Sequence, residues 1–161
     1  MENTLVFIHG LESTAQGAKG VFFSKNFPKM IIEDYTGDFL NRMRKLDGIL
    51  AGKNNLIIVG SSYGGLMAAH FAMENEKRIK KLILLAPALN LSEFKPNDDK
   101  PLSMPVIIYH GTQDDVVNPQ TVKDIAQKYF RNLEHHFVDD DHPLHKTFSS
   151  LDWKRLLTAD G

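Results

Sequence analysis

The 161-residue sequence contains no cysteine, and its 19 lysine and arginine residues nearly balance its 20 aspartate and glutamate residues. The absence of cysteine excludes disulfide bonds, thiolate metal sites and cysteine nucleophiles. The balanced charge, a formal net charge of -1, leaves no basic excess for binding nucleic acid or an anionic membrane surface. We therefore expect neither nucleic acid nor a membrane among the partners of this chain.

Long hydrophobic runs are absent as well. The N-terminal run Leu5–Ile8 ends at His9, which makes it too short for the apolar core of a signal peptide. No run approaches the roughly 18 residues that are needed to span a bilayer. These features indicate a cytoplasmic protein, and the chain length predicts a single domain over residues 1–161.

Short apolar runs alternate with longer amphipathic ones along the chain. Several of the short runs are apolar almost throughout, which is typical of parallel strands that are covered on both faces of a sheet. The six expected strands are Leu5–Gly10, Met30–Tyr35, Leu56–Ser61, Lys81–Ala88, Val106–Gly111 and His135–Asp140.

Helical patterns lie between these runs. Apolar residues at helical spacing extend from Phe39 to Leu50, and a second helix is expected to begin at Asn118–Pro119, a cap followed by proline. Leu66–Met73 is apolar on nearly every side, and Phe148–Leu157 is a less regular terminal helix. The alternation predicts an α/β fold: a mostly parallel sheet of about six strands with helices on both faces.

Polar side chains gather where the expected strands end, and ligands of such sheets bind beyond the carboxyl ends of the strands. Ser62 follows the third strand, Asp114 and Asp115 follow the fifth, and His142 and His145 follow the last. A serine, an acid and a histidine can therefore converge at one edge of the sheet. The three strand ends carry them in that order along the chain.

The segment Gly60–Gly64 (GSSYG) fits the pattern G-x-S-x-G, in which a sharp turn between a strand and a helix exposes a reactive serine. The pattern is centred on Ser62. Centring it on Ser61 fails, because Val59 and Tyr63 stand where glycines are required. A phosphate-binding loop fits worse, since G-x-G-x-x-G is absent and no Lys-Ser/Thr pair follows. Ser62 is therefore the candidate nucleophile.

A serine hydroxyl needs a base within hydrogen-bond reach, and histidine serves best when a carboxylate fixes its tautomer. The residues alone leave two acids and two histidines open for these roles. Asp139–Asp141 together with His142 and His145 can also ligate a metal ion. A role as general base explains His142 better, so we expect no metal and no cofactor.

The segments "VFIHGLES", "VGSSYGG", "LLAPAL", "IIYHGTQDDVVNP" and "VDDDHPL" resemble the α/β-hydrolase superfamily over nearly the whole chain. The chain is most similar to small serine esterases that lack a cap domain. This resemblance implies that Ser62 is the nucleophile, Asp114 the orienting acid and His142 the general base. It also implies an oxyanion hole built from the backbone N–H groups of Leu11 and Tyr63.

Larger relatives carry their cap between the strands that correspond here to Lys81–Ala88 and Val106–Gly111. Only residues 89–105 are available at this place, which predicts a loop or a short helix and an open, shallow site. His9 and His110 are expected to shape the floor of the site. The expected pocket residues are Leu11, Leu89, Leu91, Phe94, Val117 and Leu144.

The expected function is that of a serine carboxylesterase, which hydrolyses small or short-chain acyl esters through an acyl-enzyme intermediate. A thioesterase, an acyltransferase or a small peptidase would use the same three side chains. A hydrolase-shaped binding protein without turnover is the alternative from another class. The partner would be a small-molecule ester, and a homodimer formed over the open face is also left open.

Overall fold

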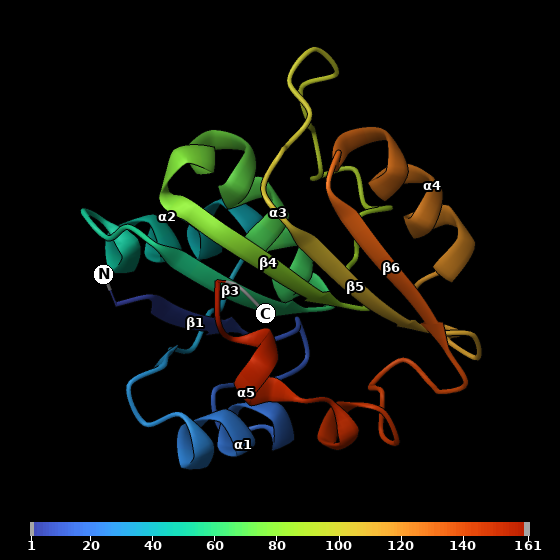
Figure 1. Cartoon of the computed structure of the whole chain (residues 1–161), viewed down its shortest axis with the longest axis horizontal. Coiled ribbons are helices and arrows are strands. Elements are labelled where there is room, and N and C mark those ends of the chain that lie inside the picture. Colours follow the sequence, from blue (N-terminus) through green and yellow to red (C-terminus); the bar gives the residue numbers. More distant parts are fainter. Residues whose placement is uncertain (1, 160–161) are drawn as a thin grey trace.

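The structure, a computed structural model, describes residues 2–159 and contains one six-stranded sheet in the order β2-β1-β3-β4-β5-β6 (Figure 1). The strands are β1 Thr4–Ile8, β2 Ile31–Ile32, β3 Leu56–Ser61, β4 Ile79–Leu85, β5 Val106–Gly111 and β6 Leu133–Val138. The helices are α1 Ala18–Asn26, α2 Phe39–Leu50, α3 Tyr63–Asn75, α4 Pro119–Tyr129 and α5 Trp153–Leu156, with short 3-10 turns at Glu76–Arg78 and Phe148–Ser150.

All five strand pairs are parallel, so the carboxyl ends of the strands lie along one edge of the sheet. The chain first moves from β1 outward to β2 and then returns to add β3 on the other side of β1. This reversal of direction leaves a crevice beyond the ends of β1 and β3, which is where open α/β sheets bind their ligands.

Helices cover both faces of the sheet, as Figure 1 shows: α1 and α5 lie on one face, and α2, α3 and α4 lie on the other. Successive side chains of a strand point to opposite faces, which divides the core into two layers. Val6 and Ile8 of β1 therefore pack with the α2–α3–α4 layer, while Phe7 between them packs against Phe23 of α1. The predicted fold class is confirmed.

The structure corrects several predicted boundaries. The strand predicted over Met30–Tyr35 shrinks to two residues, because the N–H of Tyr35 donates to His9 Nε2 instead of to a neighbouring strand. The strand predicted to reach Ala88 ends at Leu85, since the chain turns at Ala86 (φ 43°). The strand predicted over His135–Asp140 begins two residues earlier and ends at Val138.

The helices show further differences. The helix expected from Leu66 begins directly after Ser62, and the single terminal helix expected over Phe148–Leu157 is a 3-10 turn followed by α5. Helix α1 was not predicted, because its pattern is weak and only Gly20 and Phe23 of its residues are buried.

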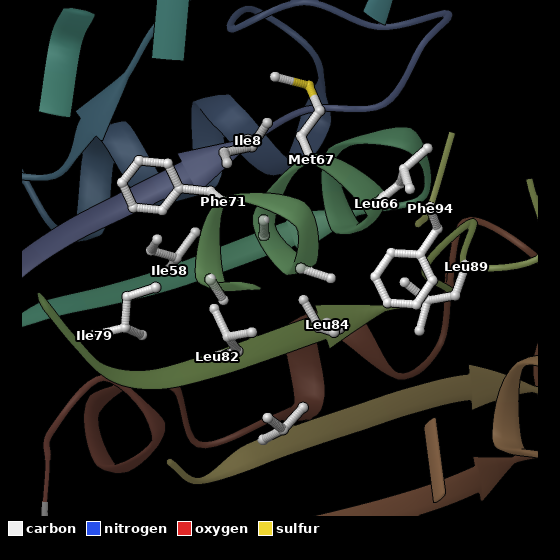
Figure 2. Packing of buried hydrophobic residues seen from close by; sticks show 14 of the residues in the cluster. Ile8, Ile58, Leu66, Met67, Phe71, Ile79, Leu82, Leu84, Leu89 and Phe94 are labelled. Atoms are coloured by element: carbon white, nitrogen blue, oxygen red, sulfur yellow. The ribbon is translucent and has the colours of Figure 1, made fainter. Parts of the chain in front are cut away.

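Residues 86–105 connect β4 to β5 where a cap would lie. In the described chain this connection contains no helix, and an isolated bridge joins its Leu102 to Phe130 at the end of α4. Leu89 and Phe94 of this loop pack beside Leu66 and Leu84 in the core (Figure 2). The expectation of a capless fold is confirmed. Within residues 2–159, none of the helices has both the length and the apolar character that crossing a membrane requires.

Candidate active site

Ser62 lies between β3 and α3 in a strained backbone conformation, with φ 55° and ψ −115°. A residue other than glycine adopts this region only when its surroundings enforce it. The N–H of Ser62 donates to Leu85 O (2.9 Å), and Ser62 O accepts the N–H of Ala88 (3.0 Å). Hydrogen bonds to the β4 end of the sheet thus fix the turn on which the serine hydroxyl is presented.

The two glycines of the motif are required by contact distances. A Cβ at Gly60 would lie 2.4 Å from the carbonyl oxygen of Gly64, and a Cβ at Gly64 would lie 2.1 Å from that of Ile8. Glycine at both positions lets β3 reverse directly into α3 and lets α3 approach the end of β1. The tight turn that the G-x-S-x-G pattern predicts is therefore present.

His142 reaches Ser62 from the loop after β6. Its Nε2 lies 3.0 Å from Ser62 Oγ, and its Nδ1 lies 2.6 Å from Asp114 Oδ2. Because the carboxylate accepts a hydrogen bond, Nδ1 carries the proton and the lone pair of Nε2 faces the serine hydroxyl. The arrangement has the tautomer that a histidine needs in order to remove a proton from serine.

Asp114 is held as a buried carboxylate: its side chain has no exposed surface. Its Oδ1 accepts the N–H groups of Val116 and Val117, each at 2.8 Å. Burial alone would raise the pKa of Asp114. The hydrogen bonds from Val117, His142 and Val116 outweigh that effect and hold the pKa of this carboxyl below its usual value. A negative charge therefore stands behind His142 at neutral pH.

The loop that carries His142 is fixed by a second buried acid, Asp140. Its Oδ1 accepts the N–H of Asp141, and its Oδ2 accepts those of Lys146 and Thr147. Lys19 Nζ of α1 also donates to Pro143 O at 2.7 Å. These contacts fix the backbone on both sides of His142.

Two backbone N–H groups are available for an oxyanion. Within residues 2–159, the amides of Leu11 and Tyr63 have no hydrogen-bond acceptor, and both residues line the cleft at Ser62. His9 Nδ1 donates to Gly10 O (2.7 Å). Because a carbonyl and the following N–H point in opposite directions across a trans peptide, this contact also sets the direction of the Leu11 N–H.

A cleft of about 550 Å³ opens over Ser62. Of the predicted pocket residues, Leu11, Leu91 and Val117 line it. Leu89, Phe94 and Leu144 do not: all three are buried in the core, and Leu144 turns inward through a positive φ of 59°. The residues that line the cleft without having been predicted to do so include Lys19 of α1, Asn90, Val116 and Pro143.

The alternative acid and base do not join this chain of hydrogen bonds. Asp115 is exposed, and His145 Nδ1 instead pairs with Asp141 Oδ2 at 2.6 Å on the surface. The structure thus brings together Ser62, His142 and Asp114. Across the described residues, no three histidine or acidic side chains converge as a group that could hold a metal ion.

The residue after the serine connects the site to the 86–105 loop. The Tyr63 hydroxyl donates to Glu93 Oε2 at 3.0 Å, and burial together with Glu93 raises the pKa of this phenol to about 12. The Arg42 guanidinium lies 5.3 Å from the centre of the Tyr63 ring. Tyr63 therefore stays protonated and holds the loop beside the cleft.

Comparisons with known proteins agree with this architecture. A model of the alpha/beta hydrolase family matches residues 39–150, which is more than half of the chain. The chain therefore belongs to the alpha/beta hydrolase family, as its motifs indicated. No curated protein matches its sequence.

Solved structures share the fold at low sequence identity. Est1E from Butyrivibrio proteoclasticus is 17% identical with a TM-score of 0.77, over 92% of this chain and 83% of that one. Alpha/beta hydrolase domain-containing protein 10 from mouse is 20% identical with a TM-score of 0.73, over 89% and 83%. An esterase, RhEst1 from Rhodococcus sp. ECU1013, is 16% identical with a TM-score of 0.68, over 95% and 86%. At these identities the likeness concerns the fold.

Proposed function

We propose that this chain is a serine carboxylesterase that hydrolyses short-chain acyl esters through an acyl-enzyme intermediate. The observation that carries the proposal is the chain of hydrogen bonds from Ser62 Oγ through His142 to the buried Asp114, in which Ser62 and His142 line an open cleft. A binding protein would need neither a strained serine nor a histidine held in the tautomer of a base.

The reaction begins when Ser62 Oγ attacks the ester carbonyl and transfers its proton to His142 Nε2. The C=O π bond opens, and its electron pair resides on the oxyanion, which the N–H groups of Leu11 and Tyr63 stabilise. His142, now an imidazolium balanced by Asp114, donates its proton to the leaving alcohol as the C–O bond breaks. Water then repeats these steps on the acyl-enzyme and releases the acid.

The walls of the cleft support an apolar, short acyl ester as the substrate. Leu11, Leu91 and Val116 line the cleft and are 49%, 36% and 67% exposed, although large apolar residues are usually covered. A small apolar group bound beside Ser62 would remove these side chains from water. A loop stands where a cap would enclose a long acyl chain.

The test is hydrolysis of p-nitrophenyl acetate, butyrate and octanoate by the wild type and by Ser62→Ala. Ser62→Ala should lose on the order of 10⁶ in kcat. A serine-directed fluorophosphonate should add once to the wild type, as intact-protein mass spectrometry reports. Ser61→Ala should still form this adduct and Ser62→Ala should not.

The outcomes separate the alternatives. Turnover of acyl thioesters or aminoacyl amides, with no ester hydrolysis, would assign the same residues to a thioesterase or a peptidase. Adduct formation without turnover of any of these substrates would favour an acyltransferase that lacks its acceptor. A folded wild type that neither reacts nor turns over would point to a binding protein.

A further inference from the structure

Two imidazole rings meet one oxygen atom of Asp114. His142 Nδ1 lies 2.6 Å from Oδ2, and His110 Nε2 lies 3.0 Å from the same atom. His110 belongs to β5, and its side chain has no exposed surface. The esterase mechanism described above requires only the first of these two rings.

The surroundings of His110 fix its protonation state. Nε2 faces two acceptors, Asp114 Oδ2 and Val117 O (3.1 Å), so this nitrogen carries the proton. Nδ1 is buried and has no hydrogen-bond partner among residues 2–159. A second proton there would be buried without an acceptor, which is costly. Burial accordingly lowers the pKa of His110 and keeps the ring neutral.

We propose that His110 is a positioning residue. It fixes the orientation of the Asp114 carboxylate through its Nε2–H and weakens the electrostatic interaction of that carboxylate with the His142 imidazolium. This inference rests on the proposed function. Oδ1 is fixed by the amides of Val116 and Val117, and Oδ2 by the two rings, so both oxygens have two donors. The carboxylate cannot rotate without breaking hydrogen bonds at both ends.

The His110 contact has a chemical consequence as well as a geometric one. A donor on Oδ2 stabilises negative charge at the atom that also stabilises the His142 imidazolium. The carboxylate is then less basic toward His142 than it would be with one ring alone. Removal of the His110 donor should strengthen the pairing of the imidazolium with Asp114 and move the acid limb of the pH profile of activity to higher pH.

The other titratable groups near His110 do not account for a shift of the acid limb of activity. The titratable groups that face His110 are Asp114, His142 and, from β6, His135. Burial, Lys123 of α4, His110 and His136 lower the pKa of His135 to about 4, so this ring is neutral over the working range. A change in the acid limb of activity therefore does not arise from His135.

The experiment compares His110→Phe, which keeps a flat ring and removes the donor, with His110→Gln, whose side-chain amide can place an N–H near the position of Nε2. The readout is kcat/KM for p-nitrophenyl butyrate from pH 5 to 9. His110→Phe should lower the plateau roughly tenfold to a hundredfold, the size of one hydrogen bond to a charged group. Its acid limb should move to higher pH by about half a unit or more. His110→Gln should recover most of both effects.

His135→Phe is the matched control, because it removes a neighbouring imidazole that does not contact Asp114. It should leave the acid limb in place. An acid limb of His110→Phe that matches the wild type would overturn the proposal. So would equal damage by His110→Gln and His110→Phe, because His110 would then only fill space.

A second measurement needs neither turnover nor a folded variant. ¹⁵N NMR of the histidine side chains in the wild type should show His110 neutral and protonated at Nε2 from pH 7 to 8. A proton on Nδ1, or titration of His110 in this range, would contradict the proposed role of His110. Failure of the esterase proposal would appear separately, as a wild type no more active than Ser62→Ala.

Discussion

Gly64 at the start of α3 packs directly against the carbonyl oxygen of Ile8 at the end of β1, so that a Cβ on Gly64 would lie 2.1 Å from that atom. Real Cβ atoms do not approach this closely, and the obstacle is backbone rather than a flexible side chain. The contact joins the segment that follows Ser62 to the segment that precedes Leu11. Both amides proposed for the oxyanion hole depend on it.

Gly64→Ala should therefore destabilise the protein and impair the site together. We expect a loss of roughly 2–4 kcal/mol in the free energy of unfolding, as for other severe backbone clashes. Urea denaturation followed by circular dichroism measures it. Gly48→Ala in α2 is the control, because nothing lies within 4 Å of its Cβ, and it should stabilise by about 0.5–1 kcal/mol. An unfolding free energy of Gly64→Ala equal to the wild type would contradict this account.

Asp114→Asn should cost about 10⁴ in kcat with little change in KM for p-nitrophenyl butyrate. The side-chain amide of asparagine carries no negative charge to balance the His142 imidazolium. It also no longer favours the tautomer of His142 in which Nδ1 carries the proton and the lone pair of Nε2 faces Ser62. Asp115→Asn is the matched control, since Asp115 is exposed and contacts neither histidine. It should stay within about twofold of the wild type. A larger loss in Asp115→Asn than in Asp114→Asn would move the acid to the neighbouring residue.

The residues alone predict a serine, an acid and a histidine at one edge of the sheet, but they leave Asp114 and Asp115, and His142 and His145, open for the last two roles. Glycine spacing marks the turn at Ser62, and the order of parallel strands places the ends of β3, β5 and β6 along one edge. Sequence reasoning could rank Asp114 above Asp115 only through the resemblance to a known family. In the structure, the N–H groups of Val116 and Val117 donate to Asp114 and hold its carboxylate in place, whereas Asp115 is exposed.

The elements that sequence reasoning missed depend on tertiary contacts. Helix α1 has little periodicity of its own, and Phe23 is buried because it packs on Phe7, Phe148 and Trp153 from distant segments. Leu144 stands two residues from His142 and was predicted to line the pocket. Its positive φ turns it into the core instead, and nothing in the residue type signals that turn.

Asp140→Asn should weaken the loop that holds His142, in a manner that depends on pH. Burial raises the pKa of Asp140, but the N–H groups of Asp141, Thr147 and Lys146 outweigh this and hold it below its usual value. A carboxyl whose pKa is lower in the folded state stabilises the fold above its unfolded pKa, near 4. That contribution is lost as the pH falls through the folded value.

The measurement is the free energy of unfolding from pH 7 to pH 2. Asp140→Asn should be less stable than the wild type by about 1–3 kcal/mol at pH 7, and the difference should shrink below about pH 4. Asp139→Asn changes an exposed carboxylate that accepts one hydrogen bond from Gln113 and should stay within about 0.5 kcal/mol. A difference for Asp140→Asn that is constant down to pH 2 would show that the charge is not what stabilises the loop.

Val116 should contribute to the preference for acyl chain length. Its side chain is 67% exposed, and the residue lines the cleft, so its apolar surface is free to cover a bound chain. Val116→Ser should raise KM for p-nitrophenyl butyrate by roughly threefold to tenfold, since burying one or two methyl groups is worth about that much, and should barely change KM for the acetate. Leu40→Ser is the control: Leu40 is 56% exposed on α2 and does not line the cleft, so both KM values should match the wild type. Equal changes for both esters in Val116→Ser would mean that this residue contacts the part that the two substrates share, and that the acyl chain lies against another wall.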